Sequence, residues 1–260
     1  MKTINGDRVH ISVHIEGTTN SSFLAELGKI YGQEHVLVYE LSQKRFIRLS
    51  DLPTSSPASN LIKLGKGLLE NTPLINQIIP DSENDPALSG TSYVRKHLPP
   101  DTAVVHGHFT PNLFRGIFDN PFTSVILRDP LDRAIALYDE WNQKKGKVDW
   151  RATVPYQAKM YFQEFALKEE FINYQSRSLG NRRLGDYDLV GVAECQVGFI
   201  AQLKNEDWTE YISPESSGYS LEKSPYKKLG ITQEFLEEFQ EAYQMDYSIY
   251  QQAKAFMGYC

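Results

Sequence analysis

Cysteine is almost absent from this chain of 260 residues, which contains only Cys195 and Cys260. Two cysteines exclude a framework of several disulfide bonds, and we expect no bridge at all. The sequence also has no CxxC pair and no cysteine–histidine cluster with the spacing of a zinc site. We therefore expect a protein that holds no metal ion.

Long apolar runs are also missing. No segment approaches the roughly 18–20 uninterrupted apolar residues that a membrane-spanning helix needs. Residues 1–8 (MKTINGDR) lack the apolar region of a secretory signal. These two features predict a cytoplasmic protein with no membrane span.

Excess positive charge is the third feature that the sequence lacks. Lys and Arg total 27 against 33 Asp and Glu, a formal net charge of −6, so binding to nucleic acid through bulk positive charge is excluded. Hydrophobic residues make up 41% of the chain and aromatic residues 12%, which is enough for a large core. No linker-like break divides the sequence, so we expect one domain over residues 1–260.

Short apolar segments rich in β-branched residues alternate with helical patterns along the chain. This order predicts an α/β fold with a central, mostly parallel sheet and helices on both faces. Strands are expected at residues 9–15, 35–40, 45–49, 103–105, 123–127 and 188–193, and helices at 23–32, 61–69, 130–141, 156–174 and 232–256. A further helix through Phe199 and Leu203 is expected after the strand at 188–193.

A loop of small polar residues, 16–22 (EGTTNSS), follows the first expected strand. In parallel sheets, ligands bind beyond the carboxyl ends of strands, and a helix N-terminus there attracts phosphate. The loop is equally consistent with an ordinary strand–helix connection that ends in a Ser or Asn cap. Neither GxxxxGK[ST] nor GxGxxG is present, so the common nucleotide-binding fingerprints are excluded.

Arg128 stands where the strand at 123–127 meets the next helix, whose start is marked by Asp129 as N-cap and by Pro130. A guanidinium at this sheet edge suits bidentate contact with a phosphate. Arg133, one turn later, is expected in a surface ion pair with a nearby aspartate.

His106 and His108 flank Gly107 at the end of another expected strand. A histidine in this position is a candidate general base, because its pKa lies near working pH. A hydrogen-bonded structural role is the alternative for each. A metal pair lacks an evident third ligand.

Together these segments resemble sulfotransferases related to heparan sulfate 2-O-sulfotransferase. Residues 14–22 (HIEGTTNSS) look like the family's HIPKTAGTS loop, and 126–138 (ILRDPLDRAIALY) resemble its LRDPxxRxxSxY segment. The resemblance continues, in the family's order, at 106–109 (HGHF), 187–194 (YDLVGVAE) and 246–250 (DYSIY). The matches span nearly the whole chain, and the LRDP segment is the most specific.

The resemblance implies a P-loop-like three-layer sandwich and the sulfuryl donor 3′-phosphoadenosine 5′-phosphosulfate (PAPS). It implies that Arg128 binds the 3′-phosphate and that His108, or failing that His106, is the base. It also implies that the loop wraps the 5′-phosphosulfate with Gly17, Thr18, Thr19, Asn20, Ser21 and Ser22.

The chain departs from the family pattern where charge matters. Gly17 replaces the loop lysine, and a different alignment of the loop puts Asn20 at an arginine of other sulfotransferases. Ala136 replaces the serine that binds the 3′-phosphate. Glu16 adds a carboxylate, which is unfavourable beside an anionic donor unless the side chain points away or serves as a base. A late loop could supply the missing cation through Lys223, Lys227 or Lys228.

The sequence therefore predicts a sulfotransferase that uses PAPS and a hydroxylated acceptor, which is a carbohydrate, a lipid or a small metabolite. The alternative is a non-catalytic protein of the same fold that binds only a nucleotide or a partner. A kinase is a third reading, and the absence of a Walker lysine weighs against it.

Overall fold

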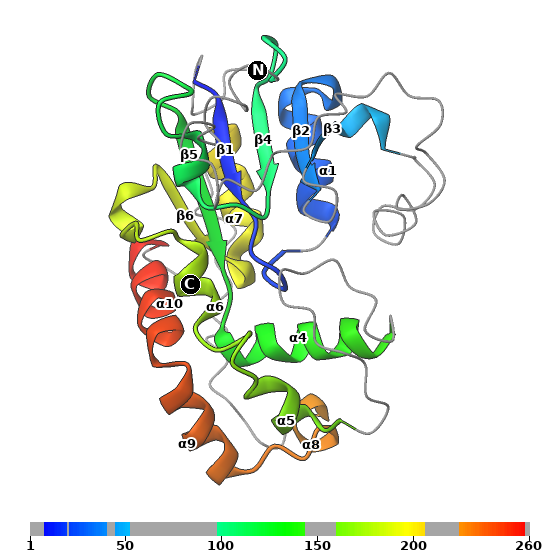
Figure 1. Ribbon diagram of the computed structural model, residues 1–260, viewed down its shortest axis with the longest axis vertical. Helices are drawn as coiled ribbons and strands as arrows, with labels where there is room; N and C mark the ends of the chain where they lie inside the picture. Colours follow the sequence, from blue (N-terminus) through cyan, green and yellow to red (C-terminus); the bar gives the residue numbers. More distant parts are fainter. Residues whose placement is uncertain are drawn as a thin grey trace, which may run out of the picture.

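The central sheet has six strands within the residues that the computed structural model describes, namely 8–19, 21–40, 45–52, 98–143, 160–205 and 224–257. The strand order is β3-β2-β4-β1-β5-β6 (Figure 1). All neighbours pair in parallel except β2 and β3, which are antiparallel. The strands are β1 (His10–Val13), β2 (Val36–Glu40), β3 (Arg45–Arg48), β4 (Val104–Gly107), β5 (Phe122–Leu127) and β6 (Leu189–Val192).

Helices surround this sheet, which confirms the predicted α/β class. The helices are α1 (Ser21–Tyr31), α4 (Pro130–Gln143), α5 (Phe162–Ala166), α6 (Tyr174–Ser178), α7 (Gln196–Lys204), α8 (Ser224–Lys228), α9 (Gln233–Ala242) and α10 (Gln244–Met257). Short 3₁₀ turns lie at Gln33–His35, Leu49–Asp51, Pro111–Phe114, Leu184–Asp186 and Ala193–Cys195.

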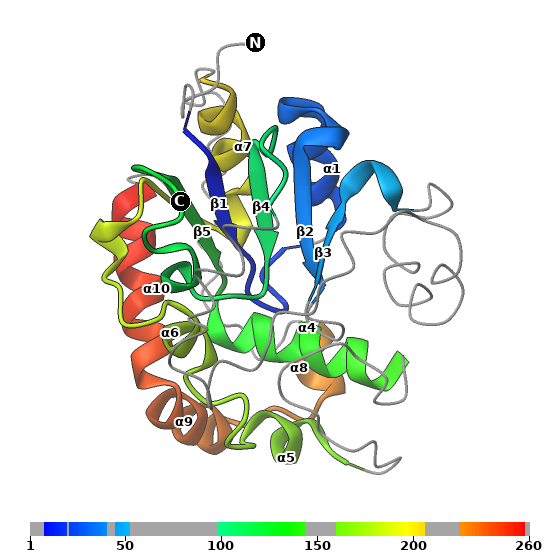
Figure 2. The ribbon, with the colours of Figure 1, turned by 45° about the horizontal axis from the view of Figure 1, so that its top comes forward.

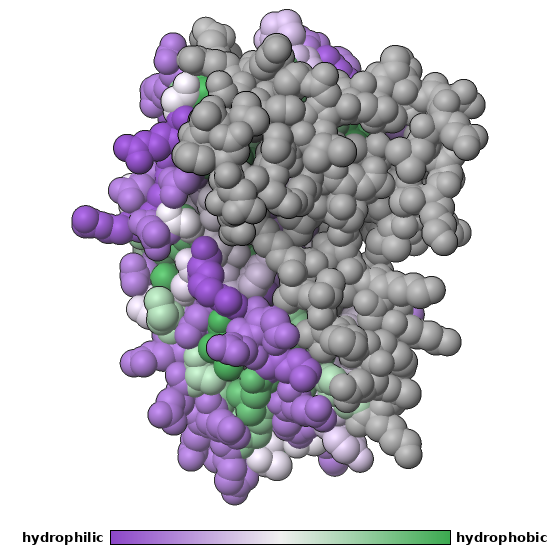
Figure 3. Space-filling view, in the orientation of Figure 1, coloured by the Kyte–Doolittle hydropathy of each residue, from purple (hydrophilic) through white to green (hydrophobic). Residues whose placement is uncertain are grey.

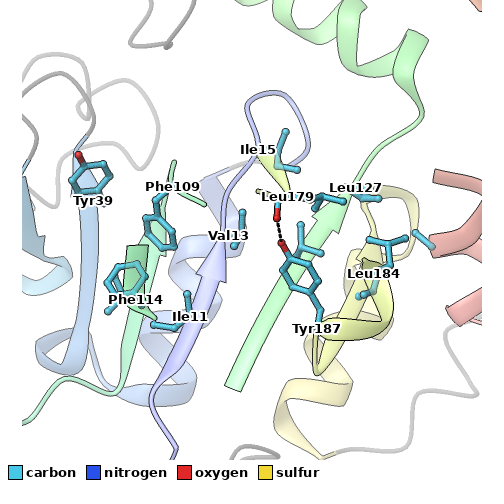
Figure 4. Close-up of a cluster of buried hydrophobic side chains, with 14 of the residues drawn as sticks. Ile11, Val13, Ile15, Tyr39, Phe109, Phe114, Leu127, Leu179, Leu184 and Tyr187 are labelled. Carbon is cyan, nitrogen blue, oxygen red and sulfur yellow. Dashed lines mark hydrogen bonds between the residues drawn. The ribbon is translucent and has the colours of Figure 1, made fainter. Parts of the chain in front are cut away.

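Apolar residues cover both faces of the sheet, as expected for parallel strands buried on two sides. On one face, Ile11 and Val13 of β1 belong to a core that includes Tyr250 and Ala253 of α10 (Figure 4). On the other face, residues of β2, β4, β5 and β6 pack with Phe23 and Leu27 of α1 and with Phe199 and Leu203 of α7. The chain therefore forms an α/β/α sandwich.

A third core lies beyond the carboxyl ends of the strands, where α4 runs across the sheet edge and α5, α8 and α9 lie next to it (Figures 1 and 2). Its centre is aromatic: Trp141, Phe165, Phe239 and Tyr243 are all fully buried. This helical layer lies beside the sheet edge at which β4, β1 and β5 end (Figure 1).

Two of the expected helices are wrong in length. The helix expected over 156–174 is interrupted within its described part, where α5 ends at Ala166 and α6 begins only at Tyr174. The helix over 232–256 divides into α9 and α10 at Tyr243. The helix expected at 61–69 lies outside the described residues.

One side chain accounts for the break between α9 and α10. The amide of Asn173 donates to the carbonyl of Ala242 at 3.0 Å and accepts from the backbone N–H groups of Met245 and Asp246 at 3.1 Å each. It therefore satisfies a carbonyl at the end of one helix and two N–H groups at the start of the next. Helical periodicity alone does not reveal such a contact.

Cys195 is disulfide-bonded, which corrects the expectation from composition that no bridge forms.

Hydrophilic residues dominate the described surface at the lower left of Figure 3, where Figure 1 places α9 and α10. Among the described residues, every helix is too short or too polar to cross a membrane.

Candidate functional site at the carboxyl ends of β4, β1 and β5

A tight turn opens the loop between β1 and α1. The backbone N–H and the hydroxyl of Thr18 both donate to the carbonyl of Ile15, at 3.1 and 2.8 Å. Gly17 has φ +78° and occupies the third position of this four-residue turn, as a type II turn requires. The hydroxyl of Thr18 already donates its proton within the turn. It therefore cannot also donate to a ligand, as the resemblance implied.

Gly17 is also required by its neighbours on α4. A Cβ atom at this position would lie 3.1 Å from Cγ of Leu137 and 3.2 Å from Cγ of Arg133. The glycine therefore lets the loop approach α4, whereas the sequence analysis placed it among the residues that wrap the phosphosulfate. This packing explains physically why no lysine stands here.

Arg128 lies at the end of β5 and reaches across to the loop that follows β1. Its Nη1 donates to the carbonyl of Gly17 at 3.0 Å. The buried side-chain amide of Gln175 fixes its backbone, because this amide accepts from the N–H of Arg128 and donates to its carbonyl, each at 2.9 Å. The predicted phosphate-binding arginine and the predicted loop are therefore in direct contact.

The start of α4 has the predicted cap. Oδ1 of Asp129 accepts from the backbone N–H groups of Leu131 at 2.9 Å and Asp132 at 3.2 Å. This confirms Asp129 as the N-cap and sets the direction in which α4 leaves β5.

Arg133 is buried, and the expected surface ion pair is wrong. Its side chain is 1% exposed, its Nε donates to the carbonyl of Glu16 at 2.8 Å, and its guanidinium lies 4.8 Å from the ring centre of Tyr174. Its Nη1 has no hydrogen-bond partner among the described residues. Two arginines thus hold two successive carbonyls of the turn, and sequence reasoning found only one of them.

His106 is enclosed at the end of β4. It is 6% exposed and its Nδ1 is hydrogen-bonded to the hydroxyl of Ser12 on β1 at 2.9 Å. Burial, followed by the nearby His14 and His108, lowers its pKa well below the ordinary value. These properties fit the structural alternative for this histidine.

The glycine between the two histidines has a steric reason. A Cβ atom on Gly107 would lie 2.6 Å from Cβ of Tyr39 on the neighbouring strand β2. The chain can then turn directly after β4 and carry His108 back toward β1, where its ring centre lies 4.3 Å from that of His14.

His14 connects the histidines to the loop. Its Nδ1 is hydrogen-bonded to the hydroxyl of Thr19 at 3.0 Å. Burial, and then the neighbouring His108, lowers its pKa to about 3, although Glu16 acts in the opposite direction. His14 is therefore neutral at physiological pH.

His108 is the less enclosed of the two predicted bases. Its side chain keeps 19% of its surface exposed, and Nδ1 lies 3.3 Å from Oε1 of Glu16. Sequence reasoning treated Glu16 as an unfavourable neighbour of the donor. The structure instead brings this carboxylate to the histidine.

The remaining predicted residues divide between this edge and parts that are not described. Ser22 is exposed in the first turn of α1, and Lys227 and Lys228 are exposed on α8. Tyr226, also on α8, donates from its hydroxyl to Oδ1 of Asp132 at 2.9 Å, so this helix is tied to the start of α4. Asn20, Lys223 and the side chain of Ser21 lie outside the described residues.

Within the described part of the chain, no three His, Cys, Asp or Glu side chains form a group that could hold a metal ion. The site consists instead of a turn held by two arginines, a helix N-terminus and a histidine beside a buried carboxylate. No protein-family model matches this chain, and no curated protein is similar to it.

Proposed function

We propose that the protein is a sulfotransferase that moves a sulfuryl group from PAPS to a hydroxyl group of an acceptor. The observation that carries the proposal is the convergence of three separate sequence segments. The loop after β1, His108 after β4 and Arg128 after β5 lie at one edge of three adjacent strands, and Arg128 contacts the loop directly.

The sheet topology supports a donor site between β1 and β5. Along the strand order, the chain continues from β1 to β2 in one direction and from β5 to β6 in the opposite direction. The crevice between such strands is the usual ligand site of an open α/β sheet. In the P-loop-like arrangement that we propose, the N-terminus of α1 faces the 5′-phosphosulfate and Arg128 binds the 3′-phosphate.

Within this scheme, His108 removes the proton from the acceptor hydroxyl as its oxygen attacks sulfur. The bond between sulfur and the bridging oxygen of the donor breaks, and the electron pair leaves with the nucleotide product, adenosine 3′,5′-bisphosphate (PAP). The protein aligns the two substrates and withdraws the proton, which are the main requirements of an in-line displacement.

The loop at residues 14–22, which we call the donor loop, lacks the lysine of the resembled family, and this absence should lower the reaction rate. Loss of one donor to a developing negative charge typically lowers the rate by about 10²–10³. Lys227 and Lys228 are the described candidates for a substitute, because Tyr226 ties their helix to the start of α4. Arg133 is too deeply buried for this task, so its role is to hold the turn.

Thermal melting with PAP tests the proposal, with adenosine diphosphate as the control that lacks a 3′-phosphate. A ligand at 100 times its Kd stabilises the folded state by about 2.7 kcal/mol. For a chain of this size that corresponds to a rise in Tm of about 5–10 °C. We expect this rise with PAP and a much smaller one with adenosine diphosphate.

The variant Arg128→Ala should remove the response to PAP, whereas Arg115→Ala, which alters an exposed arginine after the 3₁₀ turn Pro111–Phe114, should retain it. The Tm of each variant without ligand gives its own baseline, because Arg128 also holds the turn. No rise in Tm at millimolar PAP would overturn the proposal.

The non-catalytic alternative also has an observation in its favour. The donor loop carries a buried carboxylate, Glu16, and residues 14–22 contain no lysine or arginine. If the protein binds PAP but PAPS is neither hydrolysed nor transferred to any hydroxyl acceptor, this alternative replaces the enzyme.

A further inference from the structure

Glu16 is an unusual residue to find buried. Its side chain is 5% exposed, and neither carboxylate oxygen accepts a hydrogen bond of normal geometry from the described residues. Its backbone is held firmly, because Arg133 binds its carbonyl and the residue lies inside the turn from Ile15 to Thr18. A buried charge is expensive unless it has a partner, so its position calls for an explanation.

The group that faces this carboxylate is the imidazole of His108, with Nδ1 3.3 Å from Oε1. Two other titratable groups among the described residues lie near the same imidazole: His14, which directly follows β1, and His106 of β4. Both have strongly lowered pKa values because they are buried, so neither is charged near neutral pH. Glu16 is therefore the acidic side chain beside a cluster of three imidazoles, of which His14 and His106 are neutral.

We propose that Glu16 is a positioning residue for His108, and this inference rests on the proposed sulfotransferase function. The carboxylate lies 3.3 Å from Nδ1 of His108 and favours the tautomer with its proton on that nitrogen, which leaves the lone pair on Nε2 to receive the proton of the acceptor hydroxyl. The acceptor oxygen forms its bond to sulfur, the bond from sulfur to the bridging oxygen breaks, and PAP leaves with that electron pair.

The charges change favourably during this step. Before the transfer the pair carries one negative charge, on Glu16, and after it the imidazolium and the carboxylate neutralise each other. A buried carboxylate beside the base thus favours the protonated form that the reaction produces. It also explains how a negative side chain is tolerated next to an anionic donor, since the transferred proton cancels its charge as the reaction proceeds.

The test is an NMR titration of His108 in the wild-type protein and in Glu16→Gln, with the resonance assigned by its loss in His108→Asn. An opposite charge at this distance raises a histidine pKa by about one unit or more. We therefore expect Glu16→Gln to lower the pKa of His108 by at least about one unit. Glu26→Gln on α1, which alters a glutamate paired with Lys29 and Lys204, should leave it unchanged.

Activity gives a second readout that a purely structural role would not produce. With PAPS and an acceptor, Glu16→Gln should move the acid limb of the kcat profile and lower kcat more than it changes the KM for PAPS. Glu16→Asp withdraws the carboxylate by one methylene group, so its kcat should lie between those of the wild type and Glu16→Gln. It replaces Glu16→Gln in the test if that variant does not fold.

The outcomes separate the two proposals. A His108 pKa that is the same in wild type and Glu16→Gln overturns the role of Glu16, even if PAP binds. A lowered pKa in a protein that does not bind PAP supports the pairing and overturns the sulfotransferase. A lowered pKa together with PAP binding and the kcat shift supports both.

Discussion

Two carboxylates, Glu16 and Asp246, are buried among the residues that the structure describes, and their surroundings are opposite. Asp246 of α10 is fully buried, and its oxygens accept from the backbone N–H groups of Gln175 and Ser176, at 3.1 and 2.8 Å, and from the hydroxyl of Ser176 at 2.7 Å. Glu16 is 4% exposed and has a histidine at 3.3 Å in place of such donors. A carboxylate surrounded by fixed donors holds a fold together, whereas one beside a titratable ring is suited to proton chemistry.

The two sites share Arg133. Its guanidinium binds the carbonyl of Glu16, and its charge acts on Asp246, whose pKa burial raises while Arg133 and the donors from Ser176 oppose that rise. The arginine therefore links the helix that carries Asp246 to the turn that carries Glu16. The same buried cation supports both sites, so the comparison can be tested by changing each carboxylate separately.

The largest effect is expected for Asp246→Ala. This change leaves three donors without an acceptor in a buried place, so it should lower the free energy of unfolding by about 3–5 kcal/mol. Urea unfolding of the variant measures it. Asp139, an exposed carboxylate on α4, provides the control. Asp139→Ala should change stability by less than about 0.5 kcal/mol. A loss below about 1 kcal/mol for Asp246→Ala would show that its donors find water instead.

Acid should lower the stability of the fold through His10 of β1, the strand that precedes Glu16, but not through Asp246. Burial lowers the pKa of His10 at the start of β1 to about 3, so its stabilising contribution is present above pH 6.5 and is lost as pH falls from 6.5 toward 3. By pH 5 this one group accounts for about 2 kcal/mol. The raised pKa of Asp246 means that acid does not weaken the fold through that group.

Urea unfolding at pH 7, 6 and 5 measures this loss. The variant His10→Asn should lower stability at pH 7, because it breaks contacts with Ser124 and Tyr31, but its stability should fall less steeply with acid. Equal slopes in the two proteins would contradict the prediction.

The turn beside Glu16 should tolerate a side chain poorly. Gly17→Ala combines φ +78° with contacts of 3.1–3.2 Å to Leu137 and Arg133, and we expect a loss of about 2–3 kcal/mol. Gly116→Ala is the matched control, since Gly116 has φ +74° and, apart from its chain neighbours, no heavy atom of the described residues lies within 4 Å of the place that its new methyl group would take. That variant should lose about 1 kcal/mol from backbone strain alone. Equal losses would mean that α4 moves aside and that a longer side chain fits at Gly17.

Much of the fold could be predicted from local patterns, because they act over short distances. The strands at 103–105 and 123–127 and the capped start of α4 follow from β-branched runs and from the Asp129-Pro130 pair. The division of the last helix could not, because Asn173 causes it from 69 residues away along the chain. The single domain over residues 1–260 stays a prediction.

The candidate site was predictable only in its outline. Sheet-edge reasoning placed the loop, Arg128 and the two histidines together, because parallel strands all end at one edge. It missed Arg133, since the aspartates beside it in the sequence suggest a surface ion pair while the fold turns it inward. It also left the role of Glu16 open, because sequence distance hides the histidine 92 residues later that faces it.

The smallest effect on stability is expected for Glu16→Gln. This variant therefore gives the clearest test of the difference between Glu16 and Asp246. The amide keeps the size of the side chain and removes a buried charge that has no regular hydrogen bond, so the lost contact with His108 and the relieved desolvation oppose each other. We expect the free energy of unfolding at pH 7 to change by less than about 1 kcal/mol. Asp246→Asn, the same chemical change at the other carboxylate, should cost about 1–3 kcal/mol, since its amide group cannot accept from every donor there. If the two variants lose equally, Glu16 is a structural anchor like Asp246, and the difference between a fold-holding and a chemically active carboxylate disappears.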